Sequence, residues 1–253
     1  MNPTYIGLAV FVCTFGGALL GLWLRTRLPA HHVTDATKDT VKLGIGLVAT
    51  MTALVLGLVT ASAKNSFDSA DTAVKHTAID ILTLDRVLAR YGPETREIRA
   101  AMKKAVGQKI EQMWPRERSQ SPRLAPSEST TSMEVLLDGV RRLTPADEVQ
   151  RRLQARAGDI SETLLATRWL AVADGTTSIP SLFLGILVLW LSIIFASFGL
   201  FAPRNATVVA VLFLCAMSVG SAVFLVLEMD RPLDGLIRVS PDPLRYAYER
   251  LNQ

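Results

Sequence analysis

Four apolar segments, each about 20 residues long, constrain this chain of 253 residues more than any other feature. A bilayer core about 30 Å thick is crossed by roughly 20 residues of α-helix, because each residue adds about 1.5 Å. The segments are Tyr5 to Leu24, Leu43 to Ala63, Ile179 to Ala202 and Ala206 to Leu227. We therefore predict an all-α integral membrane protein with four transmembrane helices in two antiparallel hairpins.

The rest of the chain is charged, which predicts an aqueous part beside the spans. Hydrophobic residues make up 49% of the sequence, yet Asp, Glu, Lys and Arg still supply 20%. The net charge of +4 is too small, and the basic residues too scattered, to indicate nucleic-acid binding. The two cysteines, Cys13 and Cys215, lie inside apolar segments and cannot form a disulfide framework.

The hydropathy pattern divides the sequence into four parts. These are a first transmembrane hairpin (1–63), a helical aqueous stalk domain (64–178), a second transmembrane hairpin (179–227) and a C-terminal hook with a short helix (228–253). In the stalk the helical spacing continues from the second span until Gly92-Pro93 ends it, and Thr144 is expected to cap a later helix. The prolines of the hook should fold it back on the stalk, where it could lock neighbouring subunits together.

The basic residues near the helix ends do not fix the membrane orientation. Five lie beside the two short loops (Arg25, Arg27, Lys38, Lys42 and Arg204), and five lie on the other side (Lys64, Lys75, Arg168, Arg231 and Arg238).

A stripe of small and hydroxyl side chains runs along one face of the second span. Its members recur at spacings of four and three residues: Gly46, Thr50, Ala53, Gly57, Thr60 and Lys64. Such a face serves either close helix packing, the commoner use, or the lining of an ion path. Similar series in the first span (Gly7, Thr14, Gly17, Gly21) and the third (Ser181, Gly185, Ser192, Gly199) are assigned to packing.

Charged residues follow the fourth span at once: Glu228, Asp230, Arg231 and Asp234. Carboxylates at a membrane exit can gate or select cations, whereas the plainer interpretation is an interfacial charge pair, such as Asp230 with Arg231 or Arg238. The pair His31-His32 lacks a third ligand at suitable spacing, so no metal site is predicted. With no catalytic or cofactor motif, and no acid, base or histidine in the interior of a span, we expect neither an enzyme nor a proton-coupled transporter.

Two stretches of the sequence resemble one known family. Ala53-Leu54-Val55-Leu56-Gly57 runs into Ser66-Phe67-Asp68 and a helix bearing Leu82, Leu84 and Arg86, and the tail reads Glu228-Met229-Asp230-Arg231-Pro232-Leu233-Asp234-Gly235-Leu236-Ile237-Arg238-Val239-Ser240-Pro241-Asp242-Pro243-Leu244. Together they resemble the bacterial membrane proteins called bestrophin-like, and the tail motif is the specific part.

The resemblance implies a function. Bestrophins are homopentameric ion channels whose second transmembrane helix lines the pore and whose helical domain lies in the cytoplasm. By this resemblance we expect a channel for inorganic ions in the bacterial inner membrane, formed by copies of this chain within the lipid bilayer. The alternative is a non-conducting membrane scaffold or sensor whose helical domain binds a protein partner.

Overall fold

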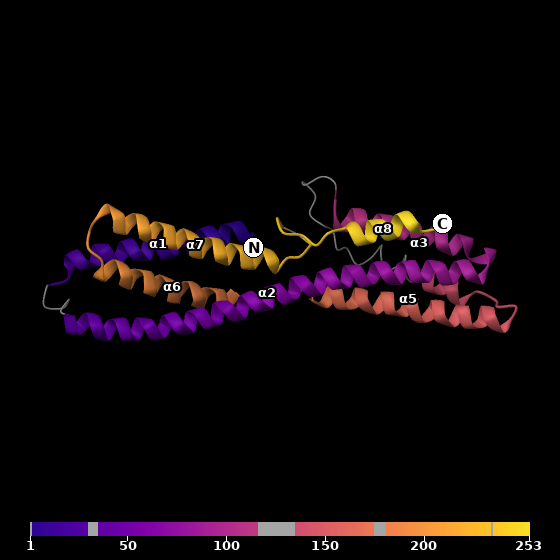
Figure 1. The fold of residues 1–253 in the computed structure, drawn as a ribbon, viewed down its shortest axis with the longest axis horizontal. Helices are drawn as coiled ribbons and strands as arrows, with labels where there is room; N and C mark the ends of the chain where they lie inside the picture. The colour runs from indigo at the N-terminus through magenta and orange to yellow at the C-terminus, as the bar shows by residue number, and fades with distance from the viewer. Residues whose placement is uncertain (1, 30–34, 116–134, 175–180, 234) are drawn as a thin grey trace. The chain divides into compact units, whose positions relative to one another are not determined.

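The computed structural model in Figure 1 describes residues 2–29, 35–115, 135–174, 181–233 and 235–253. These residues form helices joined by short connections and contain no strand. The elements are α1 (Pro3–Arg27), α2 (Asp35–Tyr91), η2 (Pro93–Thr95), α3 (Arg96–Met113), α5 (Glu148–Asp174), α6 (Ser181–Phe201), α7 (Ala206–Met229) and α8 (Asp242–Arg250), with a further helical segment at 135–141.

The predicted fold class is confirmed. Among the described residues, the helices α1, α2, α6 and α7 are long and apolar enough to cross a membrane. The predicted pairing of these helices into two hairpins stays a prediction.

The chain forms two compact units. The membrane unit contains Met1–Ser66 and Ser178–Asp230, and the helical unit contains Phe67–Thr177 and Arg231–Gln253. Helix α2 begins in the first unit and ends in the second, so one continuous helix serves both.

The closest helix contact of the membrane unit joins α1 to α6. A Cβ added at Gly17 would lie 2.8 Å from the Ser192 carbonyl oxygen, and one added at Gly21 or Gly199 would overlap the backbone of the facing helix. Residue numbers rise together along the contact, so the two helices run parallel. Small residues at these points let the two backbones approach, as expected for helices packing in lipid.

Helix α7 packs on α1 in the opposite direction. A Cβ at Gly220 would lie 3.1 Å from the Gly7 carbonyl oxygen, while Phe213 meets Phe11 and Phe15 edge to face with ring centroids 5.4 Å apart. The packing role predicted for Gly7, Gly17, Gly21 and Gly199 is therefore confirmed, as is burial of Thr14. Gly185 is different, since nothing lies within 4 Å of an added Cβ there.

Two arginines tie the ends of α1 and α6 together. Arg25 of α1 donates a hydrogen bond to the Ala202 carbonyl just after α6, and Arg204 donates one of 3.0 Å to the Leu22 carbonyl of α1. Ala202 follows the last turn of α6, where carbonyls lack a partner within the helix, and Arg25 supplies one. Leu22 lies inside α1, so Arg204 adds a hydrogen bond to a carbonyl of the helix itself.

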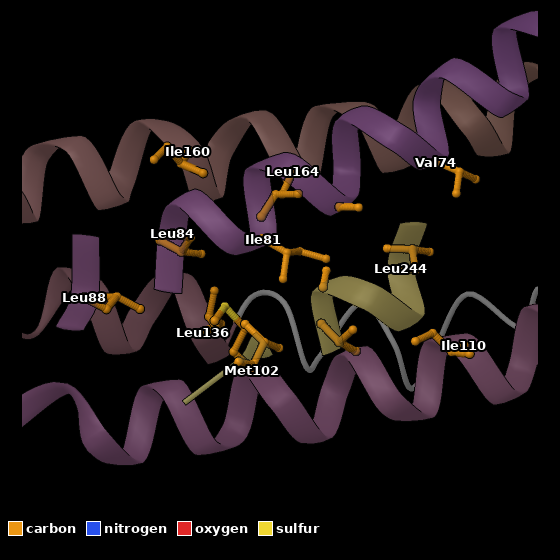
Figure 2. Packing of buried hydrophobic residues seen from close by; sticks show 14 of the residues in the cluster. Val74, Ile81, Leu84, Leu88, Met102, Ile110, Leu136, Ile160, Leu164 and Leu244 are labelled. Carbon is orange, nitrogen blue, oxygen red and sulfur yellow. The ribbon is translucent and has the colours of Figure 1, made fainter. Parts of the chain in front are cut away.

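The helical unit is built around a single hydrophobic core. Figure 2 shows side chains from α2, α3, α5, α8 and the 135–141 segment gathered in one interior. On α2 the buried positions recur at spacings of three and four: Val74, Ala78, Ile81, Leu84, Leu88 and Tyr91. This spacing is that of an amphipathic helix with one face in the core.

Helix α2 ends where the sequence predicts. Gly92 has a φ of 141°, a conformation that favours glycine, and Pro93 opens the next turn. The buried Thr95 hydroxyl contacts the carbonyl oxygens of Leu88 at 2.7 Å and Gly92 at 2.9 Å, which satisfies the end of the helix.

The predicted cap of α5 was wrong. The Asp147 carboxylate, not the Thr144 hydroxyl, accepts the hydrogen bond of the Gln150 backbone N–H at 2.7 Å. The helix begins at Glu148 because the Asp147 carboxylate just before it accepts an N–H of the first turn. Its negative charge also favours the helix N-terminus.

The C-terminal tail is fastened to its own helical unit. Val239 and Leu251 are buried, and the Trp114 indole N–H donates a 2.9 Å hydrogen bond to the Val239 carbonyl. Lys103 donates to the Leu251 carbonyl at 3.0 Å and lies over the ring of Tyr248. The tail is thus part of the core of its own chain, and whether it also joins neighbouring subunits stays a prediction.

Replacing Gly21 with Val should lower the melting temperature of the detergent-solubilised protein. The new Cβ would meet the backbone of Ala196 and Leu200, which no change of rotamer relieves. Overpacking of this kind costs about 1–3 kcal/mol. Gly16→Val is the matched control on the same helix, because nothing lies within 4 Å of a Cβ there. Equal melting temperatures for the two variants would contradict the assigned contact.

Candidate functional site

The six stripe residues of α2 all lie on the exposed side of the helix in this chain. The structure leaves each of them solvent-accessible: Gly46, Thr50, Ala53, Gly57, Thr60 and Lys64. A Cβ added at Gly46 or Gly57 would find nothing within 4 Å. The stripe therefore does not pack against any described helix of its own chain, in contrast to the glycines of α1.

The span of α2 presents three different faces. Thr52 and Ala63 are buried, and Val55 and Leu56 pack against α6 and α7. The large apolar side chains of another face are exposed: Leu43, Leu47, Met51, Leu54 and Leu58. At about 100° per residue, the stripe lies between these two faces, about 120° from the packed one.

The threonine hydroxyls of the stripe bind back to their own helix. The Thr50 hydroxyl donates a 2.9 Å hydrogen bond to the Gly46 carbonyl, and the Thr60 hydroxyl donates one of 2.7 Å to the Leu56 carbonyl. The hydroxyl proton is used in these bonds, so each oxygen turns its lone pairs outward as an acceptor.

The predicted mouth residues lie at the end of α7. Glu228 is buried in the last turn, and Asp230 is the C-cap residue, whose N–H bonds to the carbonyls of Val226 and Glu228. Glu228, Asp230 and Lys64 all have partners in the structure. Arg231 is half-buried, whereas Asp234 lies outside the described residues.

The described part of the chain contains no cluster of three or more His, Cys, Asp or Glu residues able to hold a metal ion. His31 and His32, considered above as metal ligands, lie outside the described residues.

Sequence reasoning missed a buried ion pair in the helical unit. The Asp85 carboxylate is 2% exposed and receives two hydrogen bonds from Arg99, Nε at 2.8 Å and Nη2 at 2.9 Å. The backbone N–H of Asn252 also reaches it at 3.4 Å. The signal was present, because Asp85 stands among the apolar positions Ile81, Leu84 and Leu88 of α2.

The pair joins α2, α3 and the tail at one point. The hydrogen bond from Arg99 to Asp85 raises the pKa of the guanidinium above its ordinary value, against a smaller lowering by burial. The Arg99 guanidinium therefore stays charged over the physiological range.

Tyr91 carries the other unusual polar group of this unit. Its side chain is 4% exposed, and among the described residues its hydroxyl has no hydrogen-bond partner. Burial raises the pKa of the phenol above 10.0, with smaller contributions from the charges of Glu94 and Asp147.

Comparison with known proteins finds a matching family model and solved structures of similar fold. A family model described as the bestrophin-like domain matches residues 12–244. A mutant form of a bacterial bestrophin homologue from Klebsiella pneumoniae has a TM-score of 0.67 and 17% identity, with 97% of this chain and 96% of that chain covered. A second structure of such a homologue from the same organism gives 0.67 and 16%, over 97% and 95%. No curated protein matches the sequence.

Arg99→Leu should destabilise the helical unit strongly. The change leaves the Asp85 carboxylate buried without its cation, and breaking a buried pair in this way costs about 3–5 kcal/mol. Thermal unfolding of the full chain in detergent measures the loss. Arg96→Leu, on an exposed position one turn earlier in α3, is the control and should leave the melting temperature nearly unchanged. A similar effect of both variants would show that the pair contributes little.

Tyr91→Phe should stabilise the protein at neutral pH by about 1 kcal/mol, because it removes a buried hydroxyl without a partner. The substitution should also change how the stability of the protein depends on pH in the alkaline range. An unfolded tyrosine titrates near pH 10, and the folded one above it, so the contribution of Tyr91 is complete below pH 10 and is lost as the pH rises through the folded pKa. Unfolding measured from pH 7 to pH 11 tests both effects. The exposed Tyr246→Phe serves as control, and a loss of stability in Tyr91→Phe at pH 7 would contradict the assignment.

Proposed function

Because this chain belongs to the bestrophin-like family, we propose that it is a membrane ion channel formed by several copies, with α2 of each copy lining the ion path. The resemblance to bestrophins gives five as the expected number of copies. The proposed path-lining residues are Gly46, Thr50, Ala53, Gly57, Thr60 and Lys64. No catalytic role is assigned to the chain.

The observation that carries the proposal is the exposure of α2 within a single chain. Only 6% of the 18-residue apolar stretch of α2 is buried, against 33% of the corresponding stretch in α1, 28% in α6 and 22% in α7. A helix that packs so little against its own chain has room for other copies of itself. One chain with four spans cannot enclose a wide path, whereas symmetric copies share its walls.

The chemistry of the stripe suits such a path. Small side chains leave space along the axis, and the outward lone pairs of Thr50 and Thr60 can accept hydrogen bonds from the water that surrounds an ion. The span has no Phe, Tyr or Trp, so its narrowest point would be formed by small or hydroxyl side chains.

The charged residues after α7 are proposed as the mouth of the path. Glu228, Asp230, Arg231 and Asp234 follow the fourth span and could select or gate ions there. We further propose the bacterial inner membrane as the location, with the helical unit in the cytoplasm, as the resemblance to bestrophins implies.

A second function is favoured by one feature of the helical unit. Ile79, Val135 and Val149 are large apolar side chains that stay more than half exposed in this chain. Such residues suit a scaffold or sensor whose helical unit binds a partner, and they equally suit contacts between copies. Oligomeric mass and ion flux together distinguish the two functions.

Gly57→Trp and Thr50→Trp should abolish ion flux through liposomes that contain the purified protein, because an indole on this face would fill the path. The particle mass, measured by light scattering in detergent, should not change. Leu58→Trp is the control, since Leu58 is adjacent but turned by about 100° onto the exposed apolar face.

Two outcomes would overturn the proposal. Undiminished flux in both stripe variants would remove the stripe from the path. A wild-type particle that is a single chain without flux would instead support the scaffold or sensor.

A further inference from the structure

A shallow apolar groove lies between α1 and α6 near the ends of both helices. Its volume is about 170 Å³, and it is lined by Leu20, Gly21, Leu24, Ile193, Ala196, Ser197 and Leu200. Its floor is the close crossing of the backbones at Gly21 and Ala196, where no large side chain fits. The larger residues beside this crossing form the walls.

The lining side chains offer no hydrogen-bond donor to a ligand. Ser197 is the one polar side chain, and its hydroxyl donates a 2.9 Å hydrogen bond to the Ile193 carbonyl of its own helix. Leu20 and Ile193 remain 59% and 46% exposed, so the groove is open along its length. An occupant of this groove must therefore be apolar and thin, as a hydrocarbon chain is.

A positive charge stands at the end of the same groove. Leu20, Leu24 and Arg27 follow one another at spacings of four and three, so they share one face of α1. Arg204 follows Leu200 of α6 by four residues, and its bond to the Leu22 carbonyl brings it to the end of α1.

Arg27 is the arginine of this end with no described hydrogen bond to a helix carbonyl. Arg25 and Arg204 each donate one N–H to such a carbonyl, whereas the described contact of Arg27 is with the ring of Trp23, 5.2 Å from the guanidinium carbon. A cation over a ring still directs N–H groups outward, where an oxyanion can accept them. Trp23 is itself half-exposed, as tryptophans are at the level of lipid headgroups.

The charge around this end favours an anion. The basic residues near this end are Arg25, Arg27, Arg204, Lys38 and Lys42, and the acidic ones are Asp35 and Asp39. Asp39 already pairs with Lys42 at 3.5 Å. From the apolar groove and the cation at its end, we propose that this site binds an anionic phospholipid, one acyl chain lying between α1 and α6 and the phosphate bound by Arg27.

The test measures lipid binding to the purified full chain by native mass spectrometry, as phosphatidylglycerol or phosphatidylcholine is added. Phosphatidylglycerol should bind more tightly. Arg27→Gln should weaken its binding about fivefold, the effect of one basic residue near an anionic headgroup, and leave phosphatidylcholine unchanged. Arg90→Gln, an exposed change in the helical unit, is the charge control and should have no effect.

A second variant tests the groove itself. Ser197→Phe should fill the groove and reduce the binding of both lipids, while Ser218→Phe should not. Ser218 is the matched control because its hydroxyl makes the same 2.9 Å bond to its own helix, on α7 and away from the groove. Melting temperatures without added lipid verify that each variant is folded.

Three results would overturn the proposal. One is phosphatidylglycerol binding in Arg27→Gln equal to wild type, and another is equal binding of both lipids to wild type. The third is a Ser197→Phe variant that keeps its lipid but changes particle mass, which would assign the groove to a second copy of the chain. Inorganic phosphate should not compete, because it lacks the hydrocarbon that the groove binds.

Discussion

Helix α2 meets two opposite demands along its length, and the rest of the fold follows from how it satisfies them. In its first part the apolar side chains of Leu47, Leu54 and Leu58 point away from the chain, as a helix in lipid allows. In its second part Ile81, Leu84 and Leu88 turn into a core, as water requires. The backbone hydrogen bonds continue without a break, because a helix satisfies them internally in either solvent.

The sequence predicts the helices well, since the signals for them are local. The lengths of the four apolar segments, the helical spacing after the second span and the stop at Gly92-Pro93 all correspond to elements of the structure. The cap at Asp147 was missed because Thr144 and Asp147 are both good capping residues, and only the geometry of the first turn chooses between them.

Contacts between distant segments were harder to foresee. Four successive spans alternate in direction, so the parallel sense of α1 and α6 follows from the predicted topology. Nothing in the sequence indicates that these two helices pack against each other, because that choice depends on how glycine surfaces match in space. The Asp85–Arg99 pair joins two helices through residues 14 positions apart in the sequence, and Arg25 reaches a carbonyl 177 residues away. The stripe on α2 was visible in the sequence, but no described helix of the chain covers it, so its role stays a prediction.

The parallel arrangement of α1 and α6 has an electrostatic consequence. Each helix carries a partial negative charge at its C-terminal end, and two parallel helices bring these ends side by side, where they repel. Arg25 bonds to the Ala202 carbonyl just after α6, and Arg204 bonds to the Leu22 carbonyl in the last two turns of α1. Their positive charge compensates the macrodipoles at this end. The opposite end has no acidic residue in the first turn of either helix, so the pair is held electrostatically at one end and by packing along the rest.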